Sequence, residues 1–259
     1  MIDTHTHLYM ADAYPDGDDA AAVRRAIDAG VDFMIFPGVN EHTIEPMETL
    51  HRAFPNNTAV AYGVHPDDLR DDWQVQLSEV RKRMKASHAV AVGEVGIDLY
   101  RETRYVERQK DAFEEQIRWA IEDNIPVIIH CREGLEETLE VIRRFPTDVR
   151  PKFLFHSFTY TPDEVKRIRS EVPEAMFGIN GVVTFKNAPL VREAVKEIGL
   201  AHILLETDAP YLSPVPHRGK RNESAMVPYI AQCIADTLGV SAEEVAAATT
   251  ASARAFFAI

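Results

Sequence analysis

The chain has 259 residues, a formal charge of −13 at pH 7 and a hydrophobic fraction of 46%. A chain of this size buries a core without disulfides, and its two cysteines, Cys131 and Cys233, form no zinc or redox motif. The acidic balance argues against a broad basic face for gripping duplex DNA, although bound divalent cations can reverse a local field. With no leader-like start and no apolar run of membrane length, we expect a cytoplasmic protein with no membrane contact and no obligate protein partner.

The chain starts with the segment Met1–His7, in which one residue separates His5 from His7. In a β-strand, side chains two positions apart point to the same face. Neutral imidazole is a common zinc ligand, so the pair predicts a metal site at the end of a first strand. A His-x-His pair alone also occurs by chance, and its weight depends on whether further candidate ligands occur along the chain.

Short apolar runs then alternate with longer amphipathic segments. The predicted strands are Met1–His5, Val31–Pro37, Thr58–Gly63, Ala89–Gly93, Pro126–His130, Lys152–His156, Ala175–Ile179 and His202–Glu206. Apolar residues at helical spacing predict a long helix over Arg101–Asn124, and Thr161–Glu164 and Ser241–Glu244 predict capped helix starts. This alternation predicts a single-domain (β/α)8 TIM barrel over residues 1–259. An open doubly wound sheet is the alternative, weakened by the lack of a glycine-rich phosphate loop.

Side chains that can bind metals follow most of the predicted strands. In a TIM barrel the carboxyl ends of the strands converge on one mouth, where active sites lie. The candidates at these exits are His5, His7, His65, Glu94, His130, His156 and Asp208. Taken singly, Asp208 could cap a helix and Glu94 could pair with Arg101 or Arg104. Taken together, the set favours a functional site.

Four imidazoles and two carboxylates are too many ligands for one four-coordinate ion, but they suit two divalent ions that share a carboxylate. Their chemistry fits Mg, Zn or Mn. Two-metal sites clamp the attacking and leaving oxygens of a displacement, so we expect hydrolysis, most naturally of a phosphoester. Glu94 is the expected bridge because it comes from the middle of the strand order, and Asp208 is the expected base that orients water.

Distinctive motifs recur along the whole chain. They are Asp3–His7, Gly63–Pro66, Gly93–Asp98, Ile129–Arg132, Phe155–Phe158, Gly181–Asn187, Leu204–Leu212 and Arg218–Glu223. Their content and order resemble the TatD-type metal-dependent deoxyribonucleases of the amidohydrolase superfamily, and the last two segments are the most specific. The resemblance implies a TIM barrel with two ions bridged by Glu94. It implies that the two ligand sets are His5, His7 and Asp208 for one ion and His130 and His156 for the other.

The resemblance further implies exonuclease-like hydrolysis of DNA, with His65 near the scissile phosphate. Three departures from the family pattern stand out. Ser224 replaces a proline, Thr250–Ala253 lacks an asparagine, and Cys131–Gly134 replaces the more usual Ser-Arg-Asp-Ala. We interpret the first two as structural. The third lines the predicted mouth, and it therefore bears on the identity of the substrate.

Basic residues near the strand exits are candidate phosphate contacts, and nearby aromatic residues are candidate stacking surfaces. The basic set is Arg132, Lys186, Arg218, Lys220 and Arg221, and the aromatic set is Tyr100, Phe158 and Tyr211. Ion pairs with the 41 acidic residues, and core packing of the rings, are the competing explanations.

Three classes of function remain open from the residues. The first is a two-metal deoxyribonuclease that acts on DNA, on single strands or frayed ends. The second is a metal-dependent hydrolase of a small ester, lactone, cyclic amide or phosphoester. The third is a binding barrel with vestigial metals, and the complete set of ligand positions argues against it.

Overall fold

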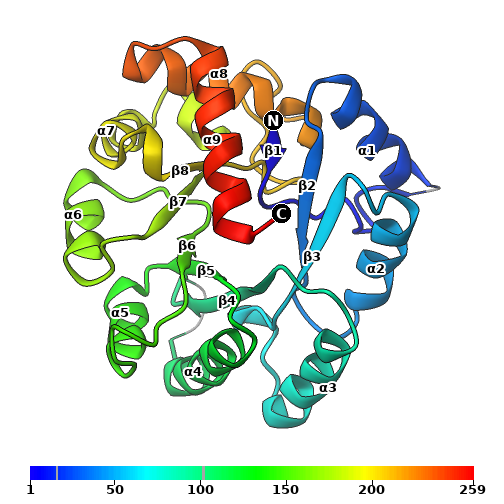
Figure 1. Ribbon diagram of the computed structural model, residues 1–259, viewed down its shortest axis with the longest axis vertical. Coiled ribbons are helices and arrows are strands. Elements are labelled where there is room, and N and C mark those ends of the chain that lie inside the picture. The colour runs from blue at the N-terminus through cyan, green and yellow to red at the C-terminus, as the bar shows by residue number, and fades with distance from the viewer. Residues whose placement is uncertain (16, 101–102) are drawn as a thin grey trace.

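In the computed structural model, which describes residues 1–15, 17–100 and 103–259, a ring of strands is surrounded by helices (Figure 1). The sheet has eight parallel strands in the order β1 to β8. They are β1 (Ile2–Asp3), β2 (Phe33–Pro37), β3 (Thr58–Tyr62), β4 (Ala91–Asp98), β5 (Val127–Arg132), β6 (Phe153–Phe155), β7 (Met176–Ile179) and β8 (Ile203–Leu205). The Thr4 amide donates to the Leu205 carbonyl at 2.9 Å and joins the first strand to the last. The predicted TIM barrel is confirmed.

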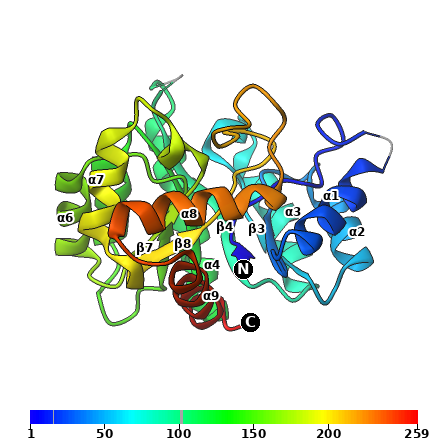
Figure 2. The same cartoon turned by 90° about the horizontal axis from the view of Figure 1, so that it is seen from above.

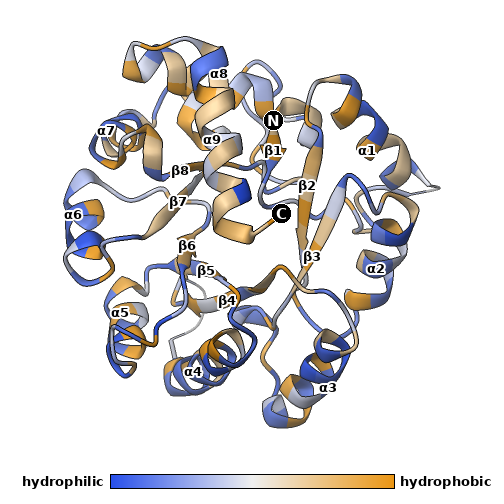
Figure 3. Cartoon of the chain, viewed as in Figure 1, coloured by the Kyte–Doolittle hydropathy of each residue, from blue (hydrophilic) through white to orange (hydrophobic). Residues whose placement is uncertain are grey.

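Helices follow the strands, and all but the last lie on the outside of the barrel (Figure 1). They are α1 (Asp18–Asp28), α2 (Ile44–Ala53), α3 (Trp73–Lys85), α4 (Val106–Asp123), α5 (Leu135–Arg143), α6 (Pro162–Glu171), α7 (Pro189–Ile198), α8 (Val227–Leu238) and α9 (Ala242–Phe257). Short 3-10 turns among the described residues are η1 (Pro66–Asp68), η2 (Gly181–Thr184), η3 (Leu200–His202) and η4 (Ser224–Met226). Figure 3 shows mixed apolar and polar faces on these helices, as expected when one side packs on the barrel. Both predicted capping boxes are present, at Thr161 and Ser241.

The amino-terminal end of the barrel is closed by α9. Phe256 and Phe257 pack with inward-facing strand residues such as Ile35, Ile128 and Leu204 in one buried cluster. Figure 2 shows α9 on one side of the barrel and the loop that follows β8 on the other. The end left open is therefore the carboxyl end of the strands. Among the described residues, none of the helices combines the length and the apolarity needed to cross a bilayer.

Strand β4 extends beyond its predicted end at Gly93 and continues to Asp98, paired with β5 from Val95 onward. Close contact between the two strands explains this, because a Cβ on Gly96 would lie 2.0 Å from the His130 carbonyl oxygen. Glu94 thus lies within β4, where the register with β5 shifts between Val92 and Val95, instead of in a loop. The predicted helix start at Arg101 lies outside the described residues, and the structure begins α4 at Val106.

Candidate metal centre

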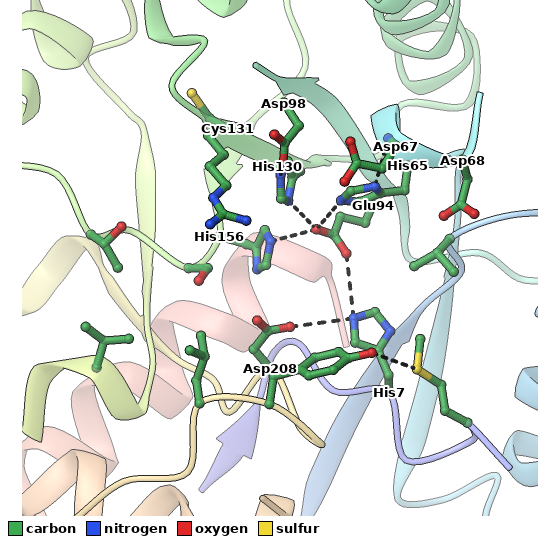
Figure 4. Close-up of a pocket in the computed structure, with 18 residues that line it drawn as sticks. His7, His65, Asp67, Asp68, Glu94, Asp98, His130, Cys131, His156 and Asp208 are labelled. Carbon is green, nitrogen blue, oxygen red and sulfur yellow. Dashed lines mark hydrogen bonds and ion pairs between the residues drawn. The ribbon is translucent and has the colours of Figure 1, made fainter. Parts of the chain in front are cut away.

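The carboxylate of Glu94 lies at the centre of the barrel mouth with imidazoles on both sides (Figure 4). Its Oε2 atom lies 3.2 Å from His5 Nε2 and 3.6 Å from His7 Nε2. Its Oε1 atom lies 2.7 Å from His156 Nε2 and 2.8 Å from His130 Nδ1. The two oxygens of one carboxylate therefore face two separate pairs of imidazoles, as a carboxylate bridging two ions would.

Asp208 joins the side of the site that holds His5 and His7. Its Oδ1 atom lies 3.7 Å from His7 Nε2 and 3.9 Å from His5 Nε2. The residue has φ of 56°, in the left-handed region that aspartate and asparagine tolerate better than most residues. The buried Asn222 side chain holds this turn by donating to the Thr207 carbonyl at 2.9 Å. The hydrogen bond from Asn222 to the backbone thus helps to hold the Asp208 carboxylate in position.

His65 also faces Glu94, but its hydrogen bonding differs from that of the other four imidazoles. Its Nδ1 atom accepts a hydrogen bond from the Asp67 amide at 3.1 Å, so a neutral ring carries its proton on Nε2. That Nε2 lies 3.5 Å from Glu94 Oε1. His65 therefore presents a donor to the mouth, which suits contact with an anionic substrate better than metal ligation.

The buried hydroxyl of Tyr9 determines the tautomer of His7. It accepts a hydrogen bond from His7 Nδ1 at 2.9 Å and donates one to the Pro37 carbonyl. With its proton held on Nδ1, His7 keeps the Nε2 lone pair directed into the mouth. This is the usual way in which a second group orients a metal-binding histidine.

The Asp98 carboxylate acts in the same manner on the other side of the site. Asp98 Oδ2 lies 2.9 Å from His130 Nε2, which leaves Nδ1 facing Glu94. Glu206 is fully buried, and its Oε1 atom accepts a hydrogen bond from the Ser157 amide at 2.6 Å and lies 3.6 Å from His156 Nδ1, so it acts on that imidazole through its charge. Gly178 provides the space, because a Cβ there would lie 2.0 Å from the Glu206 carboxylate.

Sequence reasoning missed Tyr9, Asp98 and Glu206, although a spacing signal was available. Each lies an even number of positions from a candidate ligand on the same segment: Tyr9 from His7, Asp98 from Glu94, and Glu206 from Asp208. In extended chain, even spacing places side chains on one face, and this holds for Glu94 and Asp98 in β4. It does not hold for the other two pairs, because Tyr9 lies in a turn and Asp208 has a left-handed backbone.

Burial keeps three of the imidazoles neutral. It lowers the pKa of His5 to about 4 and the pKa values of His7 and His65 to about 3. At neutral pH these rings carry no charge, and His5 Nε2 lies only 3.1 Å from His7 Nε2. Two neutral nitrogens this close to each other and to carboxylates form a donor set that suits a cation.

On the other side of the site, the imidazoles of His130 and His156 favour their protonated, charged forms. Burial opposes protonation of His156, but the Glu94 and Glu206 carboxylates together outweigh burial and raise the pKa of His156 well above its ordinary value. Burial likewise opposes the charge on His130, whose pKa is raised by Asp98 and Glu94. On the side that holds His5 and His7, burial raises the pKa of Asp208 to about 7. Cations bound here would have to displace these protons.

The mouth encloses a cavity of about 550 Å³. Of the predicted substrate contacts, Arg132 and Tyr211 line it, whereas Phe158 is buried against Phe177. The guanidinium of Arg132 stacks on the exposed ring of Tyr100.

The loop after β8 holds three of the other predicted contacts. Arg218 stacks on the ring of Phe185, and Lys220 is exposed, as is Lys186 on the neighbouring loop. Arg221 forms ion pairs with Asp18 and Glu223 and donates to the Ala13 carbonyl, so the structure supports a structural role for it.

Comparison with known proteins agrees with this geometry. The family profile described as "TatD related DNase" matches residues 2–258. The chain belongs to this family. The metal-dependent hydrolase YabD of Bacillus subtilis, described as uncharacterized, is 34% identical over 260 residues, covering 100% of this chain and 99% of the relative. The 3'-5' ssDNA/RNA exonuclease TatD of Escherichia coli is 34% identical over 267 residues, covering 100% of this chain and 99% of the relative.

A solved structure shows the same fold. The structure of YJJV, a TatD homologue from Escherichia coli, has a TM-score of 0.89 and 26% sequence identity to this chain. It covers 100% of this chain and 98% of the homologue. The resemblance noted from sequence motifs is thereby confirmed, together with the barrel, and the relatives support a metal-dependent hydrolase.

Proposed function

We propose that this family member is a deoxyribonuclease that hydrolyses phosphodiester bonds at single-stranded DNA ends, using two divalent ions at the Glu94 site. One observation carries the proposal: Oε1 and Oε2 of Glu94 face separate imidazole pairs, at 2.7 to 2.8 Å and 3.2 to 3.6 Å. We place this reaction in the cytoplasm, with nucleic acid as substrate.

Each side of the site would hold one ion. The ligands on one side would be His5, His7 and Asp208, and on the other His130 and His156, with Glu94 shared. The histidine-rich donor set favours Zn or Mn over Mg, which prefers oxygen ligands. When bound, such ions lower the pKa of water and neutralise charge on a phosphate.

The residues of the chain supply the rest of the chemistry. Asp208, on the rim side of the site, accepts a proton from the attacking water and orients it. His65 donates a hydrogen bond from its Nε2–H group to a phosphate oxygen, in line with the tautomer set by the Asp67 amide. Arg132 provides a further cationic contact on the cavity wall.

The decisive experiment for this function uses metal-stripped protein reconstituted with one ion type at a time. End-labelled single-stranded DNA, blunt duplex and a panel of small esters and lactones are assayed in parallel. We expect single strands and frayed ends to be shortened. Intact DNA beside rapid turnover of an ester or lactone would instead assign the protein to the small-molecule hydrolases, for which the Cys131–Gly134 departure leaves room.

Metal titration tests the stoichiometry separately. After stripping, we expect calorimetric titration with Zn or Mn to saturate at about two ions per chain, because the six ligands exceed the capacity of one ion. Saturation at one ion, with Glu94→Gln leaving its affinity unchanged, would contradict the bridge.

Metal binding should also release protons, and the two sides of the site should differ. His5 and His7 are already neutral, so the ion on their side displaces only the proton of Asp208, whose pKa is about 7. The ion on the other side displaces protons from both His130 and His156, whose pKa values are raised. Affinity for the first ion should therefore fall as pH drops below about 7, whereas affinity for the second ion should fall more steeply and begin to fall at higher pH, because the pKa of His156 is raised well above its ordinary value. Calorimetry at pH 6 in buffers of different ionisation enthalpy should count about one and about two protons for the two steps; equal release would contradict this assignment.

A further inference from the structure

The rim of the mouth is divided by charge. On the half formed by β1 to β4, Asp67 and Asp68 line the cavity beside His65. On the half formed by β5 to β8, Arg132 lines the cavity. On the loops that follow these strands, the exposed Arg132, Lys186, Arg218 and Lys220 outnumber the exposed Glu133. A polyanion that reaches the metals is repelled by the first half and attracted by the second.

Arg132 lies at the β5 end of the half formed by β5 to β8. It is the last residue of β5 and lies two positions after His130, so both side chains leave the strand on the same face. Its guanidinium carbon lies 3.6 Å from the centre of the Tyr100 ring, and Tyr100 is 55% exposed. Stacking of this kind fixes the plane of the guanidinium and leaves its N–H edges free for bidentate contact with a phosphate.

Arg218, in the loop after β8, also stacks its guanidinium on an aromatic ring. Its guanidinium carbon lies 3.7 Å from the centre of the Phe185 ring, which follows η2. The loop that carries it is tied to η2 by the Val215 amide, which donates to Thr184 Oγ1 at 2.8 Å. Within the described parts of the chain, neither Arg132 nor Arg218 forms an ion pair with a carboxylate, whereas Arg221, close in sequence, pairs with Asp18 and Glu223.

We propose that Arg132 with Tyr100 and Arg218 with Phe185 form two nucleotide subsites, one on each side of the scissile phosphate. In each, the arginine binds a backbone phosphate and the ring offers an edge or face to a base. The single DNA strand then crosses the mouth along the half formed by β5 to β8, over the segment that carries His156. This inference rests on the proposed nuclease function and adds the path of the substrate.

Single replacements Arg132→Ala and Arg218→Ala test the path, with Arg24→Ala as the matched control. Arg24 is an exposed residue of the outer helix α1, and its guanidinium carbon lies 5.5 Å from the centre of the Phe54 ring. Its replacement therefore removes the same charge and the same kind of stacking at a position far from the mouth. The substrates are a fluorescent single-stranded oligonucleotide and bis(p-nitrophenyl) phosphate, assayed over a range of salt concentrations.

We expect each mouth variant to lose about tenfold more kcat/KM on the oligonucleotide than on the small diester, as for a lost charged hydrogen bond. The log–log salt slope of oligonucleotide binding should become shallower by about 0.7 for each lost phosphate contact. Arg24→Ala should change neither quantity.

Equal losses on both substrates, or a salt slope identical to that of the unmodified protein, would overturn the two subsites. To separate this outcome from failure of the proposed function, oligonucleotide binding is measured by fluorescence anisotropy on metal-loaded Asp208→Asn protein. If the unmodified protein cleaves neither substrate yet the mouth variants still weaken binding, the nuclease assignment fails and the binding path stands. If cleavage proceeds and binding is unaffected by the variants, the path fails alone.

Discussion

Replacing Asp208 by asparagine should lower hydrolysis by a factor on the order of a hundred or more while leaving the fold intact. Asparagine has nearly the same shape and tolerates the left-handed backbone that Asp208 adopts, with φ of 56°. It cannot, however, take a proton from water. Its amide also offers one fewer acceptor to the ion on the His5 and His7 side.

The control for this variant is Asp163→Asn, at an exposed carboxylate in the first turn of α6. Single-turnover kinetics and thermal unfolding are measured for both proteins. We expect the unfolding midpoints to stay close together and only Asp208→Asn to lose rate. If Asp208 merely capped a turn, asparagine would replace it without effect, since asparagine also caps well. Near-full activity would transfer the role of base to Glu94 or His65.

The barrel and the convergence of its exit residues could be predicted because both depend on local pattern. Apolar runs of strand length separated by helical periodicity define β/α units, and the parallel topology then brings strand ends together. His5 and His156 show this most clearly. They lie far apart in sequence, yet their rings stack with centroids 3.8 Å apart and planes 9° from parallel.

Features that depend on contact between distant segments could not be predicted from local sequence pattern. The extension of β4 to Asp98 follows from pairing with β5, and Gly96 gives little sign of this in the sequence. The ion pairs of Arg221 with Asp18 and Glu223 connect its loop to α1, and charge counting cannot distinguish such a pair from a free cation. A basic loop is therefore weak support for a phosphate contact until its partners are known.

Replacing Glu94 by glutamine should produce the largest loss, because both sides of the site depend on this one carboxylate. An amide presents a single oxygen, and its NH₂ group would face nitrogen or oxygen atoms that need a cation. We expect one ion to bind weakly or not at all, and hydrolysis to fall by a factor on the order of a thousand or more. The metal-stripped variant is titrated with Mn, and electron paramagnetic resonance at each step measures the number of bound ions directly.

The matched variant is Glu206→Gln, which makes the same chemical change in a fully buried carboxylate 3.6 Å from His156 Nδ1. Glu206 lies beside His156 and accepts a hydrogen bond from the next residue, Ser157. Its loss should therefore weaken binding of the ion at His130 and His156 by about ten- to a hundredfold and leave binding of the other ion unchanged. If the two variants have equal effects on both ions, Glu94 has no bridging role and the site must be reconsidered as a single-ion centre. If Glu94→Gln alone removes the coupling between two manganese ions, the two oxygens of Glu94 serve two metals, as their separate contacts with the two imidazole pairs suggest.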